Sequence, residues 1–378
     1  MASVEHVLSG DGVPTGIPPS LSAHYLDAAS GRRYVAVGTE SAQDWVPIDQ
    51  CIGDVLITLR DPGNTYLPAN GGIVDPGVNA ELAAALPARW APQRPIGDSI
   101  RNIAVVGSVC LAKAQNGIWR SGDWGSTWEQ VYSGTIYNYA LAAGPGGVWL
   151  SASGDGVDRS LDDGLTWVGG GTLPTAANGL AAGSDGRWIA VGWNMAYISI
   201  NDGETWSDLD LGMEQPEGVA SDGQGVWIVV QPYRTGFRST DNGATWAEIG
   251  LSASQVGTNG AGIWIADGPD GMFRSADNGA TWQPIAAAPS GASAISGDGA
   301  KWLVVGYLNG GDEGGFISSD GGLTWSPVVE LRGSSPEGAA GSDGRWMVAG
   351  GEELYRYAAG ILPAYSVPAT LKAYIKAF

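Results

Sequence analysis

The chain has little of what several common kinds of site require. It contains only two cysteines and two histidines in 378 residues. Two cysteines, Cys51 and Cys110, are too few for a tetrahedral zinc site or a disulfide framework, so we expect two free thiols. No apolar run approaches the roughly 20 residues that a membrane-spanning helix needs. Residues 1–6 have neither a basic nor an apolar region, so we expect no secretory signal.

Basic residues are also scarce, because 19 Lys and Arg stand against 39 Asp and Glu, a formal net charge of −20. Nucleic acid and anionic membranes bind clustered Lys and Arg, so we expect neither partner and no membrane insertion. The sequence has no Asp-x-Asp-x-Asp-Gly calcium loop and no Gly-Lys-Ser/Thr phosphate loop, so we expect no metal and no cofactor. Both histidines, His6 and His24, precede the repeats described next, which argues against histidine catalysis within those repeats.

Glycine and tryptophan, in contrast, are abundant, with 60 and 17 residues. Six tryptophans and six glycines belong to one motif, Ser-x-Asp-x-Gly-x-Thr-Trp, whose copies end at Trp128, Trp167, Trp206, Trp246, Trp282 and Trp325. In the third copy Asn201 replaces the Asp. The intervals between these tryptophans are 39, 39, 40, 36 and 43 residues. A period near 40 residues indicates a repeat architecture.

The motif predicts a closed hairpin turn. Its acidic residue can accept hydrogen bonds from nearby backbone N–H groups, and its glycine can adopt a positive φ without a Cβ clash. The Ser and Thr hydroxyls can bond to the same turn, and the Trp ring can cover it. We therefore interpret the acidic position as structural and not catalytic in all six copies: Asp123, Asp162, Asn201, Asp241, Asp277 and Asp320.

This motif resembles the Asp-box, or bacterial neuraminidase repeat, of sialidase-like, sortilin-like and photosystem-assembly-factor-like β-propellers. The resemblance spans roughly residues 100–357 and implies a β-propeller. It says almost nothing about function, because functional sites are grafted onto folds.

Strand patterns refine this prediction. A strand of the form Gly/Ala-x-Trp-apolar recurs at residues 147–150, 186–189, 225–228, 262–265, 300–303 and 344–347, and 109–112 is its counterpart in the first unit. Seven such strands predict an all-β chain with a seven-bladed β-propeller over residues 96–360, six of whose blades carry Asp-box hairpins. The seventh unit lacks the motif, so its outer strand must come from the tail, residues 361–378, or from residues just before the first blade, near 95–100.

The first 95 residues predict a small attachment region. Residues 1–50 contain a Gly/Pro-rich stretch and two short strands, His24–Leu26 and Arg33–Val37, too little to fold alone. With Tyr25-Leu-Asp27 and Asp44-Trp-Val46, they resemble adaptor segments of tailed-phage fibre and virion proteins.

Residues 51–95 read as a strand at 53–59 and a helix at 79–86, a small β/α module. They resemble the phage tail-collar motif around Tyr66-Leu67 and Asn70-Gly71, with Ala69 and Asn70 departing from its usual residues. An unrelated β/α subdomain is the alternative.

The propeller loops opposite the Asp-boxes are the expected binding surface. Flat aromatic rings beside planar polar groups are typical of sugar recognition. The ligand-binding candidates are Trp193, Asn194, Tyr233, Arg234, Tyr307, Asn309 and Asp312. The alternative is that these aromatic rings only pack the loops against one another.

Enzyme activity is not expected. A sialidase resemblance would imply an arginine triad and a Phe/Tyr-Arg-x-Pro motif, but the first repeat has Ser99-Ile-Arg101 instead. The arginines that directly precede a motif Ser belong to the repeat: Arg120, Arg159, Arg238 and Arg274. Other glycosidases need only two carboxylates, which Glu214 or Glu217 with Asp312 or Glu313 could supply.

Together these patterns predict a structural protein of a tailed-phage virion, assembled in the host cytoplasm. Residues 1–95 would bind other virion or tail proteins, in a homo-oligomer, and the propeller would bind a host cell-surface glycan or protein receptor. Two alternatives stay open: a virion-associated glycoside hydrolase or depolymerase, and an assembly or decoration protein that binds only other virion proteins.

Overall fold

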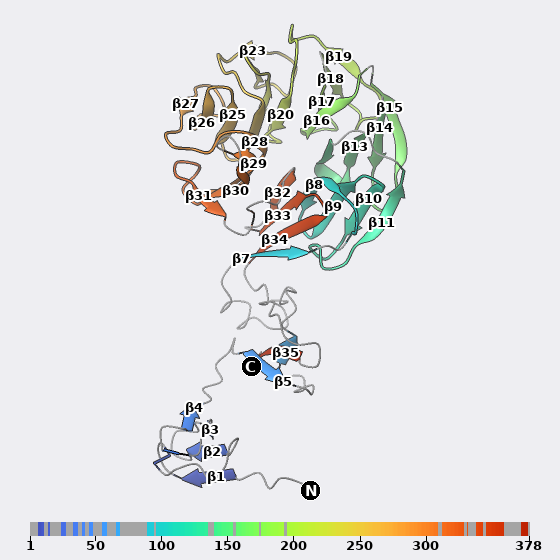
Figure 1. Ribbon diagram of the computed structural model, residues 1–378. Coiled ribbons are helices and arrows are strands. Elements are labelled where there is room, and N and C mark those ends of the chain that lie inside the picture. The colour runs from blue at the N-terminus through green and yellow to red at the C-terminus, as the bar shows by residue number, and fades with distance from the viewer. Residues whose placement is uncertain are drawn as a thin grey trace. The chain divides into compact units, whose positions relative to one another are not determined.

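The computed structural model describes residues 7–10, 14–15, 24–27, 33–36, 40–41, 45–47, 55–58, 66–68, 89–93, 96–134, 140–153, 156–173, 175–192, 195–308, 312–328, 331, 338–342, 345–358 and 372–376. The chain divides into two compact units, residues 1–87 with 362–378, and residues 88–361 (Figure 1). The described part consists of strands and turns, apart from one short 3-10 helix at Pro145–Gly147. The helix expected over 79–86 and Cys51 lie outside the described residues.

The smaller unit contains two sheets. The first has the order β1 Val7–Gly10, β2 His24–Asp27, β3 Arg33–Ala36 and β4 Trp45–Pro47, with β1 parallel to β2. The second places the C-terminal strand β35, Lys372–Lys376, between β5 Val55–Thr58 and β6 Tyr66–Pro68. The tail therefore pairs within this unit, and the larger unit is inserted between β6 and β35.

The larger unit contains six blades, each an antiparallel sheet of four consecutive strands. Blade 1 consists of β8 Ile100–Val106, β9 Val109–Ala114, β10 Gly117–Ser121 and β11 Glu129–Ser133. Blade 2 consists of β12 Leu141–Ala143, β13 Trp149–Ser153, β14 Gly156–Ser160 and β15 Val168–Thr172. Blade 3 consists of β16 Ala177–Ala182, β17 Trp188–Gly192, β18 Met195–Ser199 and β19 Ser207–Leu209. Blade 4 consists of β20 Gly218–Ser221, β21 Trp227–Val230, β22 Phe237–Ser239 and β23 Ala247–Glu248. Blade 5 consists of β24 Gln255–Thr258, β25 Trp264–Gly268, β26 Gly271–Ser275 and β27 Gln283–Pro284. Blade 6 consists of β28 Ala292–Asp298, β29 Lys301–Leu308, β30 Asp312–Ser318 and β31 Ser326–Val328.

The ring is completed by a different kind of sheet, which we call the closing sheet. It consists of β32 Gly338–Ser342, β33 Arg345–Gly350, β34 Glu353–Ala358 and, as its outer strand, β7 Arg89–Gln93. In Figure 1 the cyan β7 lies beside the red β34. We expected seven blades, and this expectation is corrected. The structure has six blades and the closing sheet, whose strands come from both ends of the larger unit. Its outer strand comes from the segment just before the first blade and not from the tail, although it lies a few residues earlier than the expected 95–100. Pro92 is tolerated because it lies on a sheet edge.

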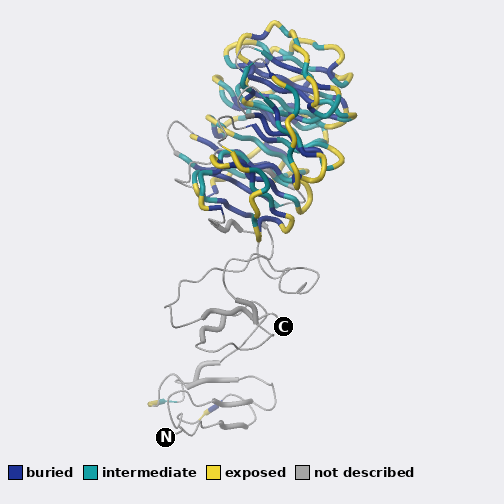
Figure 2. The backbone as a smooth tube through the Cα atoms, turned by 90° about the vertical axis from the view of Figure 1, so that its right-hand side faces the viewer, coloured by how far each residue is buried: buried dark blue, intermediate teal, exposed yellow. Residues whose placement is uncertain are grey.

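The hydrophobic core lies between neighbouring sheets. Six tryptophans of the second strands are at most 1% exposed: Trp149, Trp188, Trp227, Trp264, Trp302 and Trp346. Trp188, for example, packs against Leu150 and Val157 of the preceding blade. Figure 2 shows the strands buried and the turns between them exposed. Each blade is therefore stable only against its neighbours.

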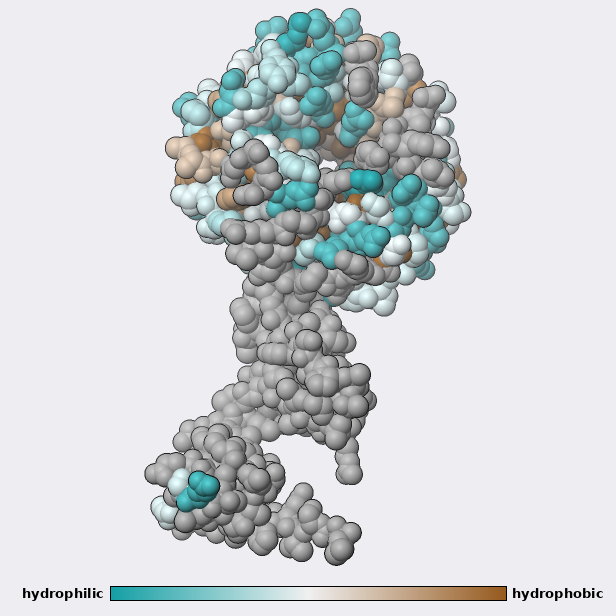
Figure 3. All heavy atoms as spheres, in the orientation of Figure 1, coloured by the Kyte–Doolittle hydropathy of each residue, from teal (hydrophilic) through white to brown (hydrophobic). Residues whose placement is uncertain are grey.

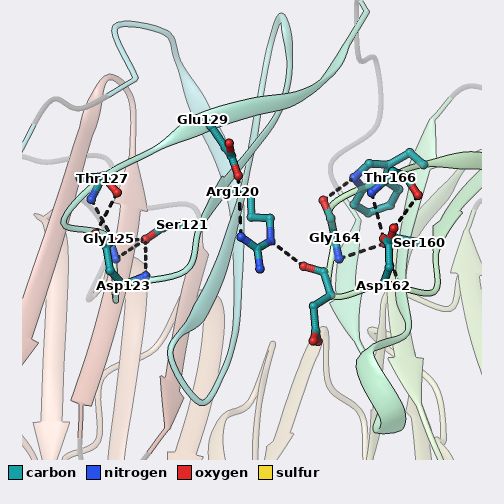
Figure 4. Close-up of polar contacts among 12 residues, drawn as sticks. Arg120, Ser121, Asp123, Gly125, Thr127, Glu129, Ser160, Asp162, Gly164 and Thr166 are labelled. Carbon is teal, nitrogen blue, oxygen red and sulfur yellow. Dashed lines mark hydrogen bonds and ion pairs between the residues drawn. The ribbon is translucent and has the colours of Figure 1, made fainter.

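Hydrogen bonds close each Asp-box turn. In blade 1 the Ser121 hydroxyl donates to Asp123 Oδ1 at 2.8 Å and accepts from the Gly125 N–H at 2.7 Å (Figure 4). The Thr127 N–H and hydroxyl donate to the two Asp123 carboxylate oxygens at 2.9 and 2.8 Å. The Ser hydroxyl bond and the Thr N–H bond recur at Asp162, Asn201, Asp241, Asp277 and Asp320. These side chains therefore use their hydrogen-bonding groups within the turns that they stabilise.

An arginine on the third strand of one sheet holds the Asp-box turn of the next. Arg120 Nε donates to Asp163 O at 2.8 Å, as Figure 4 shows, and Arg238 and Arg274 make the equivalent bonds to Asn278 and Gly321. Arg356 of the closing sheet donates to Trp124 O of blade 1 at 3.3 Å and to the Ser126 hydroxyl at 3.2 Å. This last contact joins the end of the ring to its start.

Replacing Arg356 tests this closure. Arg356 is only 1% exposed, so Arg356→Ala removes two hydrogen bonds and leaves a buried gap. We expect the free energy of unfolding to fall by roughly 2–3 kcal/mol in urea titrations. Arg238→Ala, whose bond is exposed, is the matched control and should lose less than about 1 kcal/mol. Equal losses would show that Arg356 has no special part in closure.

A buried lysine joins blades 1 and 2. Lys113 on β9 is fully buried, and its Nζ donates to Ala140 O at 3.1 Å and to Ala152 O. Burial lowers the pKa of Lys113 to about 7, although the charge of Asp158 acts in the opposite direction. The amine is therefore largely neutral in the folded protein above that pH.

This shift predicts a pH-dependent stability difference from Lys113→Met. Between pH 7 and 10 the unfolded lysine binds a proton that the folded one lacks, so its contribution to stability rises with pH. Relative to the Met variant, the wild type should gain up to about 1.4 kcal/mol per pH unit over this window. Urea titrations of both proteins at pH 6.5 to 10 measure the difference, and a constant difference would contradict a neutral buried amine.

Candidate functional site

The propeller has two distinct faces. The Asp-box hairpins join the third strand of each blade to the fourth, so they share one face with the loops between first and second strands. The loops between second and third strands and the connections between blades lie at the other ends of the strands. We call this second face the loop face.

The inner strands of the six blades and the closing sheet surround a central channel. Each contacts the next around the ring, from β8 through β12, β16, β20, β24 and β28 to β32, which contacts β8 again. The channel encloses about 380 Å³. Figure 3 shows an opening near the centre of the propeller. The inner strands or the residues just before them in all seven sheets line the channel, among them Arg101, Asn102, Ala140, Asn178, Glu217, Gln255, Ser293 and Gly338.

A second cavity of about 430 Å³ adjoins the channel beside blades 3, 4 and 5. It shares Asn178, Glu217 and Gln255 with the channel and adds Gln215 and Pro216, and we call these five residues the channel mouth. Sequence reasoning named only Glu217, as one member of a possible carboxylate pair. The available signal was the spacing of 39 and 38 residues between positions 178, 217 and 255, each at the start of an inner strand.

A buried glutamine holds one wall of the channel mouth. Gln231 is 3% exposed, and its Oε1 accepts from the backbone N–H of Glu214 at 3.0 Å and of Gln215 at 3.4 Å. Its Nε2 donates to Thr235 O at 3.0 Å. One side chain thus ties the loop after β21 to the connection that precedes β20, so both are held in a defined position.

Two predicted aromatic residues project from the loop face. Tyr233, in the loop held by Gln231, is 82% exposed and has a φ of 61°, and Tyr307 on β29 is 61% exposed. Beside Tyr233, Arg234 forms an ion pair with Glu214 at 2.7 Å, with both side chains largely exposed. A hydrogen bond with Glu313, its register partner on β30, raises the pKa of Tyr307. Neither ring is buried by neighbouring loops within the described residues.

The other predicted site residues are less informative. Trp193, Asn194 and Asn309 lie outside the described residues, and Asp312 begins β30. The two halves of the proposed carboxylate pair belong to separate blades. Glu214 and Glu217 lie beside blade 4, while Glu313 lies on β30 of blade 6.

Another carboxylate was missed by sequence reasoning. Asp267 on β25 is buried, and its Oδ2 accepts from the N–H groups of Gly291 and Ala292 at 2.8 and 2.7 Å. Burial raises its pKa. These bonds hold the connection between blades 5 and 6, so the geometry fits a structural role.

The described part of the chain holds no cluster of three His, Cys, Asp or Glu residues that could bind a metal ion. Among the described residues, no helix has the length and apolar character that crossing a membrane demands. Cys110 is a free, buried thiol.

Comparisons with known proteins support the fold. Residues 316–327, which include the whole sixth motif, match the BNR/Asp-box repeat family. No curated protein matches the chain. YCF48 bound to D1 peptide is similar in structure, with 15% identity, a TM-score of 0.53, and coverage of 72% of this chain and 99% of that one.

Two further solved structures are similar to the same extent. YCF48 from Cyanidioschyzon merolae has 16% identity and a TM-score of 0.52, covering 71% of this chain and 98% of its own. The WD40 repeats of RRP9 have 8% identity and a TM-score of 0.56, with 72% and 98% covered. These likenesses show a β-propeller and nothing about its ligand.

Replacing Gln231 should loosen the channel mouth. Gln231→Ala leaves the N–H groups of Glu214 and Gln215 without their buried acceptor, and we expect the free energy of unfolding to fall by about 1–3 kcal/mol. Gln224→Ala is the control, because this exposed side chain makes one bond, to Gly260 O. Its loss should stay within roughly 0.5 kcal/mol in the same urea titration. Similar losses for both variants would contradict the anchoring role.

Proposed function

We propose that this chain is a structural, non-enzymatic protein of a tailed-phage virion whose propeller binds a glycan on the host cell surface. The observation that carries the glycan-binding part is Tyr233, a ring 82% exposed on a loop that buried Gln231 holds in place. An exposed ring on a fixed loop can stack on a sugar face with little loss of conformational entropy.

Neighbouring groups fit the same ligand. Arg234 follows Tyr233 in the chain and forms an exposed ion pair with Glu214, which contributes little to stability. Both side chains can exchange this ion pair for bonds to sugar hydroxyls. Tyr307 adds a second exposed ring from blade 6. Adhesion needs no catalytic group, and the occupied Asp-box carboxylates supply none.

The virion part of the proposal rests on the order of segments. Phage adaptor-like and collar-like segments precede the propeller, and the smaller unit that contains them also takes in the tail strand β35. We infer attachment to other virion proteins through residues 1–95, in a homo-oligomer. We also count the closing sheet as a seventh blade, because its inner strand β32 completes the ring between β28 and β8.

One specific observation supports each of the two alternative functions. Glu217 is a carboxylate in a cavity of the loop face, as a depolymerase would require, although Glu313 belongs to a separate blade. A similar propeller, YCF48, has been solved bound to a peptide, which is compatible with an assembly protein that binds other virion proteins.

Binding to immobilised bacterial surface polysaccharides, with reducing ends measured in the same samples, tests the proposal. We expect saturable binding without release of reducing ends. Tyr233→Ala should weaken it about fivefold, because stacking of one ring contributes on the order of 1 kcal/mol. Tyr132→Ala, which alters a ring packed in blade 1, is the control and should leave affinity unchanged.

Other outcomes would decide against adhesion. Release of reducing ends that is lost in Glu217→Gln would favour the depolymerase. Binding that Tyr233→Ala leaves unchanged would contradict the assigned surface. If no polysaccharide bound while virion proteins did, the assembly alternative would replace the proposal.

A further inference from the structure

We infer that the channel mouth binds the free ammonium group of an unacetylated amino sugar. This deepens the proposed function, because it specifies one chemical feature of the glycan. It concerns a different set of residues from the exposed Tyr233 and Tyr307, so the two ideas can fail separately.

The polar residues of the mouth are brought together by close approach of three inner strands. A Cβ built on Gly179 would lie 3.3 Å from Glu217 O, and one built on Gly218 would lie 3.3 Å from the Gln255 Cα. Only small residues allow strands to approach so closely. As a result Asn178, Glu217 and Gln255, which belong to consecutive blades, line one cavity.

Among the described residues that line this cavity, the net charge is negative. Glu217 is exposed and is the only charged side chain among the five residues that line the mouth. The nearby guanidinium of Arg234 is paired with Glu214. Arg101 lines the channel from blade 1, on the far side of the ring, and does not line the mouth. A cationic group is therefore the ligand that the mouth favours.

The hydrogen-bonding groups narrow that ligand to an amino sugar. An ammonium group has three donors, which the Glu217 carboxylate and the amide oxygens of Asn178 and Gln255 can accept. The amide N–H groups of Asn178, Gln215 and Gln255 remain as donors for neighbouring sugar hydroxyls. A lysine side chain has no hydroxyl groups and would leave these amide N–H groups without an acceptor.

The test compares two probes on the full chain, the hexamer of glucosamine and the hexamer of N-acetylglucosamine. We expect the free-amine hexamer to bind at least tenfold more tightly, and Glu217→Gln to remove that preference. Since the net charge of −20 attracts any cation, Glu248→Gln is the matched control, an exposed glutamate on the outer strand of the same blade. It should leave the preference intact at physiological salt.

Each contrary result overturns the assignment. Equal affinity for both hexamers, or no binding of either, would exclude an ammonium site. An equal loss in Glu217→Gln and Glu248→Gln would assign the binding to overall charge. Tighter, Glu217-dependent binding of trilysine would assign the mouth to a basic peptide instead. Unchanged melting temperatures of Glu217→Gln and Glu248→Gln would show that a change in binding does not reflect unfolding. Polysaccharide binding by Tyr233→Ala tests the adhesion proposal separately.

Discussion

A ring of sheets leaves two apolar faces exposed to water unless its first and last members meet. Two contacts close this ring. Strand β34 pairs with β7, and the buried guanidinium of Arg356 donates a hydrogen bond to the backbone oxygen of Trp124. Because the tryptophans of the second strands are buried between sheets and not within them, every interface depends on this closure. The Asp-box turns and their arginines repeat one local solution around the ring, and Arg356 extends it across the junction.

Closure also creates the candidate site. Asn178, Glu217 and Gln255 are 77 residues apart from first to last, and no single blade brings them together. They line one cavity because the ring places consecutive inner strands side by side, with glycines where the strands approach most closely. The Asp-box face uses its polar side chains for turns, whereas the loop face keeps polar and aromatic groups exposed. In the proposed function, stability and recognition are thereby assigned to opposite ends of the same strands.

The local parts of this fold were predictable, and the parts that depend on closure were not. Asp123 and its counterparts lie in turns whose partners are within four residues, so the motif alone indicates them. The strand Arg89–Gln93 carries no motif and pairs with residues more than 250 positions away. The sequence did not indicate Arg356, because Tyr357 follows it where a motif Ser follows the arginines of the repeat. Tyr233 was predictable as a loop aromatic, whereas Gln255 resembles any other strand glutamine until the ring is assembled.

The insertion of the propeller between β6 and β35 has a mechanical consequence. Arg89 and Ala358 are register partners, so the chain enters and leaves the propeller at the same end of one strand pair, and both continuations belong to the smaller unit. A pulling force between a ligand on the propeller and an anchor on that unit would be shared by two covalent tethers. Both strands would be drawn in the same direction, so neither would slide past or peel from the other. Such an attachment can bear tension without loading the hydrogen bonds that close the ring.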